Sequence, residues 1–144
     1  MVSNPQELIT ILKTQHRGLQ NDLKLVLDEL NSETTLNSRV VVSKLAKFKD
    51  DLLAHLKLEN GEFYPDYLAK KDKKGEDTTS TKEFMKIMED IGKVVLAFLD
   101  KYSSAEVVES SRLVFTKELQ EIISTLNTRI ETEEEGVFDI YLIY

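Results

Sequence analysis

Cysteine is absent from the 144 residues of this chain. Because disulfides and thiolate ligands both need cysteine, the sequence excludes disulfide crosslinks, zinc–thiolate sites and iron–sulfur clusters. No uninterrupted apolar run approaches the roughly 18 residues that span a bilayer, and the first residues lack the basic flank and apolar run of a secretory signal. We therefore expect a cytoplasmic protein without a membrane partner.

Positive charge and glycine are also scarce. The chain has 19 Lys and Arg against 26 Asp and Glu, which gives a net charge of −7. This excess of acid argues against nucleic acid as a partner, and the short basic run at 70–74 is typical of a solvated loop. The five glycines are scattered rather than grouped, so no phosphate-binding loop is indicated.

Apolar residues recur at steps of three, four or seven along most of the chain, which is the spacing of amphipathic helices. They predict four helices, at about 5–30, 37–60, 80–101 and 105–135. Asn60, Gly61 and Pro65 are expected to loosen or end the second helix. At this length we expect residues 1–144 to form a single all-α domain, an antiparallel up-down-up-down four-helix bundle.

Two distant segments of the chain nearly repeat each other. The first is His55-Leu-Lys-Leu-Glu59 followed by Phe63-Tyr64 and Tyr67-Leu68; the second is Arg129-Ile-Glu-Thr-Glu133 followed by Val137-Phe138 and Tyr141-Leu142. His55 and Glu59 are four residues apart, so both side chains lie on one helical face, where they can share a metal ion. The second copy keeps Glu133 but has Arg129 in place of the histidine. The repeat therefore predicts a duplicated helical hairpin with a half-kept metal site.

Polar residues interrupt the apolar stripes at one height of the predicted bundle. His16, for example, falls four residues after Leu12 and three before Leu19, and so shares their face. Counting outward from the loops places six side chains in this layer: His16, His55, Glu59, Met88, Arg129 and Glu133. Buried carboxylates need positive charge nearby. Two imidazoles and two carboxylates suit iron, manganese or zinc better than calcium or magnesium.

The chain also carries several motifs of a known family. These are His16, the His55-x-x-x-Glu59 motif running into Phe63-Tyr64-Pro65, and Glu133-Glu134 followed by Phe138. With them, nearly the whole chain resembles hemerythrin-like proteins of the HHE cation-binding family. The resemblance implies a bundle with a non-haem di-iron centre, in which His16 and His55 bind the first iron and Glu59 and Glu133 bridge to the second. The second iron would need histidines where this chain has Met88, or by a one-residue shift Glu89, and Arg129.

We therefore expect a mononuclear site made of His16, His55, Glu59 and Glu133. Arg129 cannot bind a metal, but it is expected to line the site as a charge partner of the carboxylates, with Met88 packed beside it. Iron is the expected cofactor, with zinc or manganese as alternatives. The expected role is binding, sensing or storage of iron, dioxygen or nitric oxide.

Two other functions stay open from the sequence. One is a metal-free bundle that serves as an interaction or regulatory module, with Arg129 paired to the carboxylates. The other is a small iron-dependent oxidoreductase, although no nucleophile accompanies either histidine and no catalytic residue is assigned. The apolar ending at 137–144 either closes the bundle or docks on a partner. Tyr64, Tyr67 and Tyr141 are expected as lids, and Glu134 as part of a solvated acidic face.

Overall fold

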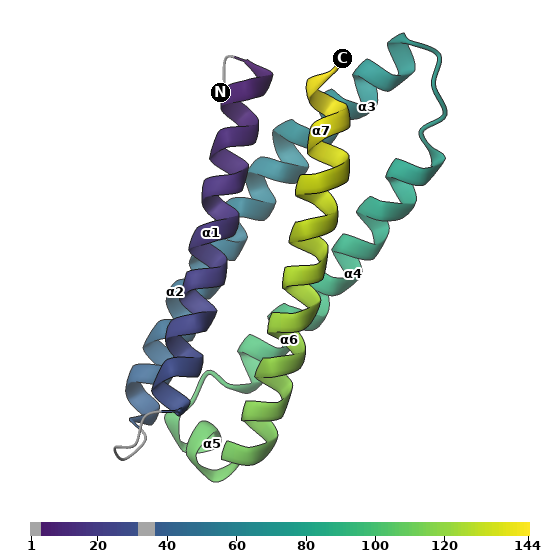
Figure 1. Cartoon of the computed structure of the whole chain (residues 1–144). Helices are drawn as coiled ribbons and strands as arrows, with labels where there is room; N and C mark the ends of the chain where they lie inside the picture. Colours follow the sequence, from purple (N-terminus) through teal and green to yellow (C-terminus); the bar gives the residue numbers. More distant parts are fainter. Residues whose placement is uncertain (1–3, 32–36) are drawn as a thin grey trace.

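The computed structural model describes residues 4–31 and 37–144, and within them every regular element is a helix, which confirms the all-α prediction (Figure 1). Four long helices form the body of the molecule: α1 (Pro5–Leu30), α2 (Ser38–Leu58), α4 (Thr79–Lys101) and α6 (Arg112–Thr132). Figure 1 shows them running in alternating directions, and α1 contacts both α2 and α6. No helix in the described part of the chain is both long and apolar enough to cross a bilayer.

Asparagine caps fix the starts of α1 and α2. The side-chain oxygen of Asn4 accepts a hydrogen bond from the backbone N–H of Glu7 at 2.7 Å, and Pro5 follows at the first helical position. Asn37 caps α2 in the same way through the N–H of Val40, at 3.2 Å. These caps satisfy N–H groups that have no partner inside the helix. The first two predicted helices also require a turn near Thr34, which lies outside the described residues.

The second predicted helix does not end near residue 60. It continues through a π-helical segment, η1 (Glu59–Phe63), into α3 (Tyr64–Lys73). A π-helical segment is one wide turn, closed by a hydrogen bond to the fifth residue instead of the fourth. Pro65 lies in the first turn of α3, directly after this wide turn, where a missing backbone N–H costs little. Gly75, the one described residue with a positive φ (71°), follows the end of α3, which is the position that favours glycine.

The fourth predicted helix is interrupted near its start and extends past its expected end. α5 (Ala105–Ser110) is separated from α6 by Ser111, with φ −119° and ψ 28°. The Ser110 hydroxyl donates to the carbonyl of Val107, which also accepts the ordinary helical bond from the Ser111 N–H. After α6 the chain continues through a second π-helical segment, η2 (Glu133–Val137), into α7 (Phe138–Leu142).

The interior contains two apolar clusters with a polar layer between them. The larger, which we call the main core, includes Leu19, Leu45, Phe98 and Phe115. The smaller, the aromatic end cluster, comprises Leu8, Ile9, Leu12, Phe63, Tyr64, Tyr67, Phe138 and Tyr141. On α1, the buried His16 lies between Leu12 of the aromatic end cluster and Leu19 of the main core. The polar layer is therefore enclosed by apolar side chains on both sides.

The apolar C-terminal segment closes one end of the bundle. Phe138 and Tyr141 are buried in the aromatic end cluster, whereas Ile140 and Ile143 are exposed on its outer side. The tyrosines expected as lids, Tyr64, Tyr67 and Tyr141, all belong to this cluster. Closure of the bundle thus accounts for the buried half of this segment.

Helix α4 packs unevenly along its length. Its buried apolar side chains, Val95, Phe98 and Leu99, all lie in the C-terminal half. Figure 1 shows the other half diverging from α6. A groove of about 820 Å³ lies between α4 and α6, lined by residues from Ile87 to Lys101 and from Glu118 to Arg129. This side of the bundle is therefore more open than the side formed by α1 and α2.

Candidate metal centre

Four buried side chains from four elements meet in the polar layer. They are His16 of α1, His55 of α2, Glu59 of η1 and Glu133 of η2, each at most 4% exposed. Each offers one ligand atom, and these atoms all lie within 4.8 Å of one another. The structure thus brings together the four residues named as ligands from the sequence.

Both carboxylates occupy the first position of a π-helical segment. The Glu59 carbonyl accepts a hydrogen bond from the N–H of Tyr64, and the Glu133 carbonyl accepts one from the N–H of Phe138, each five residues later. Such wide turns occur frequently at functional sites because they shift the side chains that follow. The repeat in the sequence therefore corresponds to a repeated local structure at each carboxylate.

Glu133 is well supplied with hydrogen-bond donors. Its Oε2 accepts from the Tyr64 hydroxyl at 2.6 Å, and its Oε1 lies 3.0 Å from Nε2 of His16. Burial acts to raise the pKa of Glu133, but hydrogen bonds from His16, Tyr64 and Glu59 outweigh it and hold the pKa below its usual value. Glu133 is accordingly the ionised member of the carboxyl pair.

Glu59 is held in the opposite state. Burial, together with the charge of Glu133, raises the pKa of Glu59 well above its usual value, and the two carboxyl groups share a hydrogen bond. Glu59 is therefore the protonated member of the pair at neutral pH. Its Oε2 atom is buried and has no hydrogen-bond partner among the described residues.

His55 faces this unsatisfied oxygen with an unprotonated nitrogen. Burial and the nearby His16 lower the pKa of His55 to about 4, so the ring is neutral at pH 7. Its Nδ1 lies 2.8 Å from the side-chain oxygen of Gln15, which can only accept, so Nδ1 carries the proton. Nε2 then presents a lone pair to Glu59 Oε2 at 2.7 Å. The contact is not an ion pair, because the ring is uncharged.

A buried nitrogen lone pair and a buried carboxyl oxygen at this separation fit a cation. The fit extends to the whole group, because two imidazoles and two carboxylates form the mixed nitrogen and oxygen set that suits iron, manganese or zinc. A metal ion would also supply the charge that the proton of Glu59 supplies without it. The residues present are therefore suited to hold a metal.

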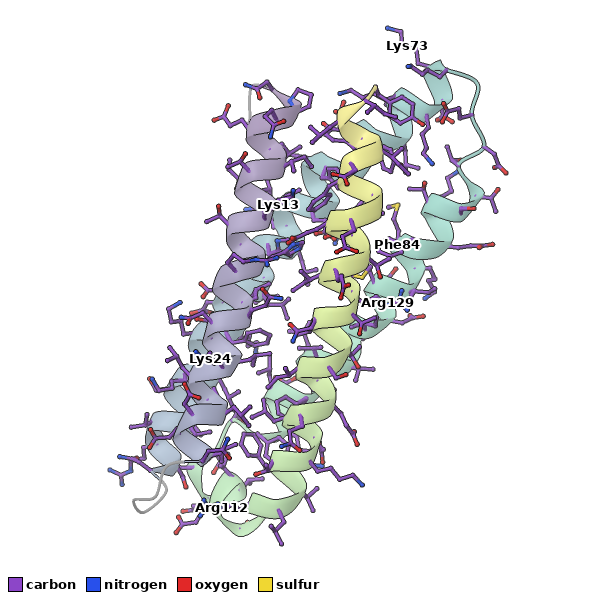
Figure 2. All side chains as sticks on the ribbon, in the orientation of Figure 1. Lys13, Lys24, Lys73, Phe84, Arg112 and Arg129 are labelled. Atoms are coloured by element: carbon purple, nitrogen blue, oxygen red, sulfur yellow. The ribbon has the colours of Figure 1, made fainter. Side chains whose placement is uncertain are left out.

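Arg129 lies outside this group. Its guanidinium carbon is 6.0 Å from the centre of the Phe84 ring of α4, and Figure 2 shows both side chains in the space between α6 and α4. No carboxylate among the described residues forms an ion pair with it, so the pairing with Glu59 and Glu133 expected from the sequence is not present. The physical reason is helical phase: Ile130 is buried, at 6% exposed, and occupies the inward position that precedes Glu133.

Met88 is half-buried on the open part of α4. The α4 side chains that pack against the aromatic end cluster are instead Phe84 and Met85, one turn earlier. The place of Met88 beside the metal ligands stays a prediction.

Sequence reasoning missed the partners that surround the two histidines. Glu134 was expected on a solvated face, but its Oε2 lies 2.6 Å from Nδ1 of His16, and Arg17 contacts the same oxygen. Gln15 was not singled out, and Tyr64 was expected only as a lid. Helical periodicity marks one inward residue per turn, so it gives no signal for the residues on either side of a ligand. The adjacency of Glu134 to Glu133 was the one available clue.

An all-helical bundle with a buried group of two imidazoles and two carboxylates defines a helical-bundle protein with a candidate metal centre. The family model described as hemerythrin HHE cation binding domain matches residues 7–141, and the chain belongs to this family. The comparisons with curated proteins and with solved structures gave no significant match. Membership of the family implies binding of a metal ion.

Proposed function

We propose that this chain binds one iron ion through His16, His55, Glu59 and Glu133. The observation that carries the proposal is the buried Oε2 of Glu59, which lacks a hydrogen-bond partner among the described residues and lies 2.7 Å from the unprotonated Nε2 of His55. The cation-binding family of the chain supports it. Iron is favoured over zinc and manganese by the resemblance to hemerythrin-like proteins.

The nitrogen content of the site supports one iron rather than two. The whole chain contains two histidines, and both belong to the same group. Arg129 cannot act as a nitrogen ligand, because its guanidinium stays protonated, and it lies against Phe84 instead. In the described residues this is also the one group of three or more histidine and acidic side chains arranged to hold a metal.

The residues of the layer have distinct roles in such a site. Tyr64 holds one oxygen of Glu133 in place, whereas Glu59 must release the proton that it shares with Glu133 before it can bind. Metal affinity is therefore expected to fall as the pH falls. The main core and the aromatic end cluster keep bulk water from both sides of the layer. Iron, when bound, supplies redox chemistry and a position for a small ligand such as dioxygen or nitric oxide.

Metal content per chain tests the proposal. The protein is loaded anaerobically with ferrous iron, freed of loosely held metal and subjected to elemental analysis. We expect close to one iron per chain in the wild type and little in His16→Ala or His55→Ala, with the exposed Thr14→Ala as control. Close to two irons would contradict a mononuclear site, and none would contradict metal binding.

Metal identity and small-molecule binding need separate measurements. Competition between ferrous iron, manganese and zinc for the metal-free protein ranks their affinities. Absorption spectra of the iron-loaded protein before and after addition of nitric oxide or dioxygen then test for a ligand. A spectrum that neither gas changes would contradict a role in binding or sensing them.

A further inference from the structure

Each imidazole of the metal centre makes a hydrogen bond through the nitrogen that faces away from the carboxylate ligands. Nδ1 of His16 lies 2.6 Å from Oε2 of Glu134, and Nδ1 of His55 lies 2.8 Å from Oε1 of Gln15. The Nε2 atoms point the other way, to Glu133 and Glu59 at 3.0 and 2.7 Å. Both rings are thus held from behind by an oxygen acceptor.

We propose that Gln15, Arg17 and Glu134 are positioning residues for the metal centre. Glu134 and Gln15 each accept the Nδ1–H of one ring, so that Nε2 of each histidine is the atom directed toward the metal position; in the metal-free protein Nε2 of His16 also donates to Glu133. Glu134 is charged and Gln15 is neutral, which makes His16 the stronger metal ligand of the two histidines. This inference rests on the proposed function and adds the residues that control the ligand strength of each histidine.

The sequence places each positioning residue next to a ligand of a different helix. Gln15 directly precedes His16 on α1 but orients His55 of α2. Glu134 directly follows Glu133 on η2 but orients His16 of α1. Adjacent residues thus supply a ligand and a side chain that orients a ligand of another helix. The packing of these helices therefore determines the orientation of the ligands, and the hydrogen bonds in turn stabilise the packing.

Arg17 completes the arrangement around Glu134. Its guanidinium contacts the same oxygen that faces His16, and it is 57% exposed whereas Glu134 is 18% exposed. The carboxylate is consequently held between a cation at the surface and an imidazole in the interior. Arg17 limits the motion of Glu134 and neutralises part of its charge.

The chemical consequence is an asymmetric pair of ligands. A carboxylate that accepts the Nδ1–H of a histidine raises the basicity of the other ring nitrogen and fixes the orientation of the ring. A neutral amide oxygen fixes the ring but adds no charge. His16 with Glu134 is therefore the stronger ligand, and His55 with Gln15 the weaker.

The first test uses the metal-free protein. Long-range ¹H–¹⁵N spectra of protein with ¹⁵N-labelled histidine report which ring nitrogens carry hydrogen. We expect hydrogen on Nδ1 of both rings in the wild type, its loss at His16 alone in Glu134→Ala, and its loss at His55 alone in Gln15→Ala. The exposed neighbour provides the control, because Glu135→Ala is expected to leave both rings unchanged.

The second test is zinc affinity, measured by competition with a chelator, because zinc has no redox chemistry. We expect Glu134→Ala to weaken binding by about 10- to 100-fold, as for other residues that orient metal ligands. Glu134→Gln keeps the hydrogen-bond acceptor and loses the charge, so we expect it to weaken zinc binding less than Glu134→Ala does. Glu135→Ala should bind as the wild type does.

Wild-type spectra and wild-type zinc affinity in Glu134→Ala would overturn the assignment. So would equal effects of Glu134→Ala and Glu135→Ala. If the wild type takes up neither zinc nor iron, the proposed function fails, whereas the spectra of the metal-free variants still decide whether Glu134 and Gln15 orient the rings.

Discussion

The hydroxyl of Tyr64 donates a hydrogen bond of 2.6 Å to Oε2 of Glu133, a residue 69 positions further along the chain. This bond joins the first copy of the repeat to the carboxylate of the second. The second copy has Phe138 at the position that corresponds to Tyr64, and phenylalanine has no hydroxyl to return the bond. Glu133 is therefore supplied with a phenolic donor, and Glu59 is left with an oxygen that lacks one.

Tyr64→Phe is expected to destabilise the metal-free protein by about 1–3 kcal/mol, because it removes a buried donor from an ionised carboxylate. Unfolding in urea measures the change. Tyr141→Phe is the matched control, since its hydroxyl donates to the more exposed Asp66. A loss in Tyr64→Phe no larger than that in Tyr141→Phe would contradict the role given to this bond.

Glu59→Gln is expected to abolish metal binding and to stabilise the metal-free protein at pH 8. The folded chain keeps Glu59 protonated well above the pKa of 4.5 that applies when it is unfolded, and each unit of this shift costs about 1.4 kcal/mol. The neutral amide removes that cost, so we expect Glu59→Gln to raise the free energy of unfolding at pH 8. Glu131→Gln, at an exposed position, should change neither property.

In the Glu59→Gln variant, the pH dependence of the free energy of unfolding can be used to measure the contribution of His55 without that of Glu59. The unfolded ring binds a proton below about pH 6.5, whereas the folded ring stays neutral down to about pH 4. The unfolded state thus holds more protons in this window, and the contribution of His55 to the free energy of unfolding falls as the pH falls, by up to about 3 kcal/mol. Glu59→Gln with His55→Gln should lose this contribution. Equal slopes in the single and double variants would contradict it.

Arg129→His is expected to leave the iron content close to one per chain. The repeat suggests that histidine at this position would restore a ligand, but Ile130 occupies the inward position and Arg129 lies over Phe84. Elemental analysis beside the wild type gives the answer. A rise toward two irons would show that the side chain at 129 reaches the metal layer.

The ligand group was accessible from the sequence because two independent patterns converge on it. The spacing of apolar residues along α1 identifies His16 as inward-facing, and the repeat identifies Glu59 and Glu133 as equivalent. Both patterns depend on α-helical periodicity, and in the structure the α-helices continue regularly up to Glu59 and Glu133. The bounds of α1 were predictable for the same reason, since Asn4 and Pro5 mark its start.

The wide turns were not predictable because their residues carry the signals of a helix end. Gly61 and Pro65 commonly stop a helix, and composition alone does not distinguish a stop from a turn closed by a bond to the fifth residue. The position of Arg129 was missed for a related reason. Alignment of the two copies matches Arg129 to His55, but the inward residue before Glu133 is Ile130, one position later.

Each wide turn acts as one extra residue in an otherwise regular helix. If the same residues followed ordinary helical bonding instead, with none removed, everything beyond the turn would be rotated by about 100°. Tyr64 or Phe138 would then leave the aromatic end cluster, while the residues before the carboxylate would stay in place. The pattern of inward-facing residues therefore shifts by one position at each wide turn. This shift lets one continuous helix supply both a polar ligand before the turn and apolar side chains to the aromatic end cluster after it.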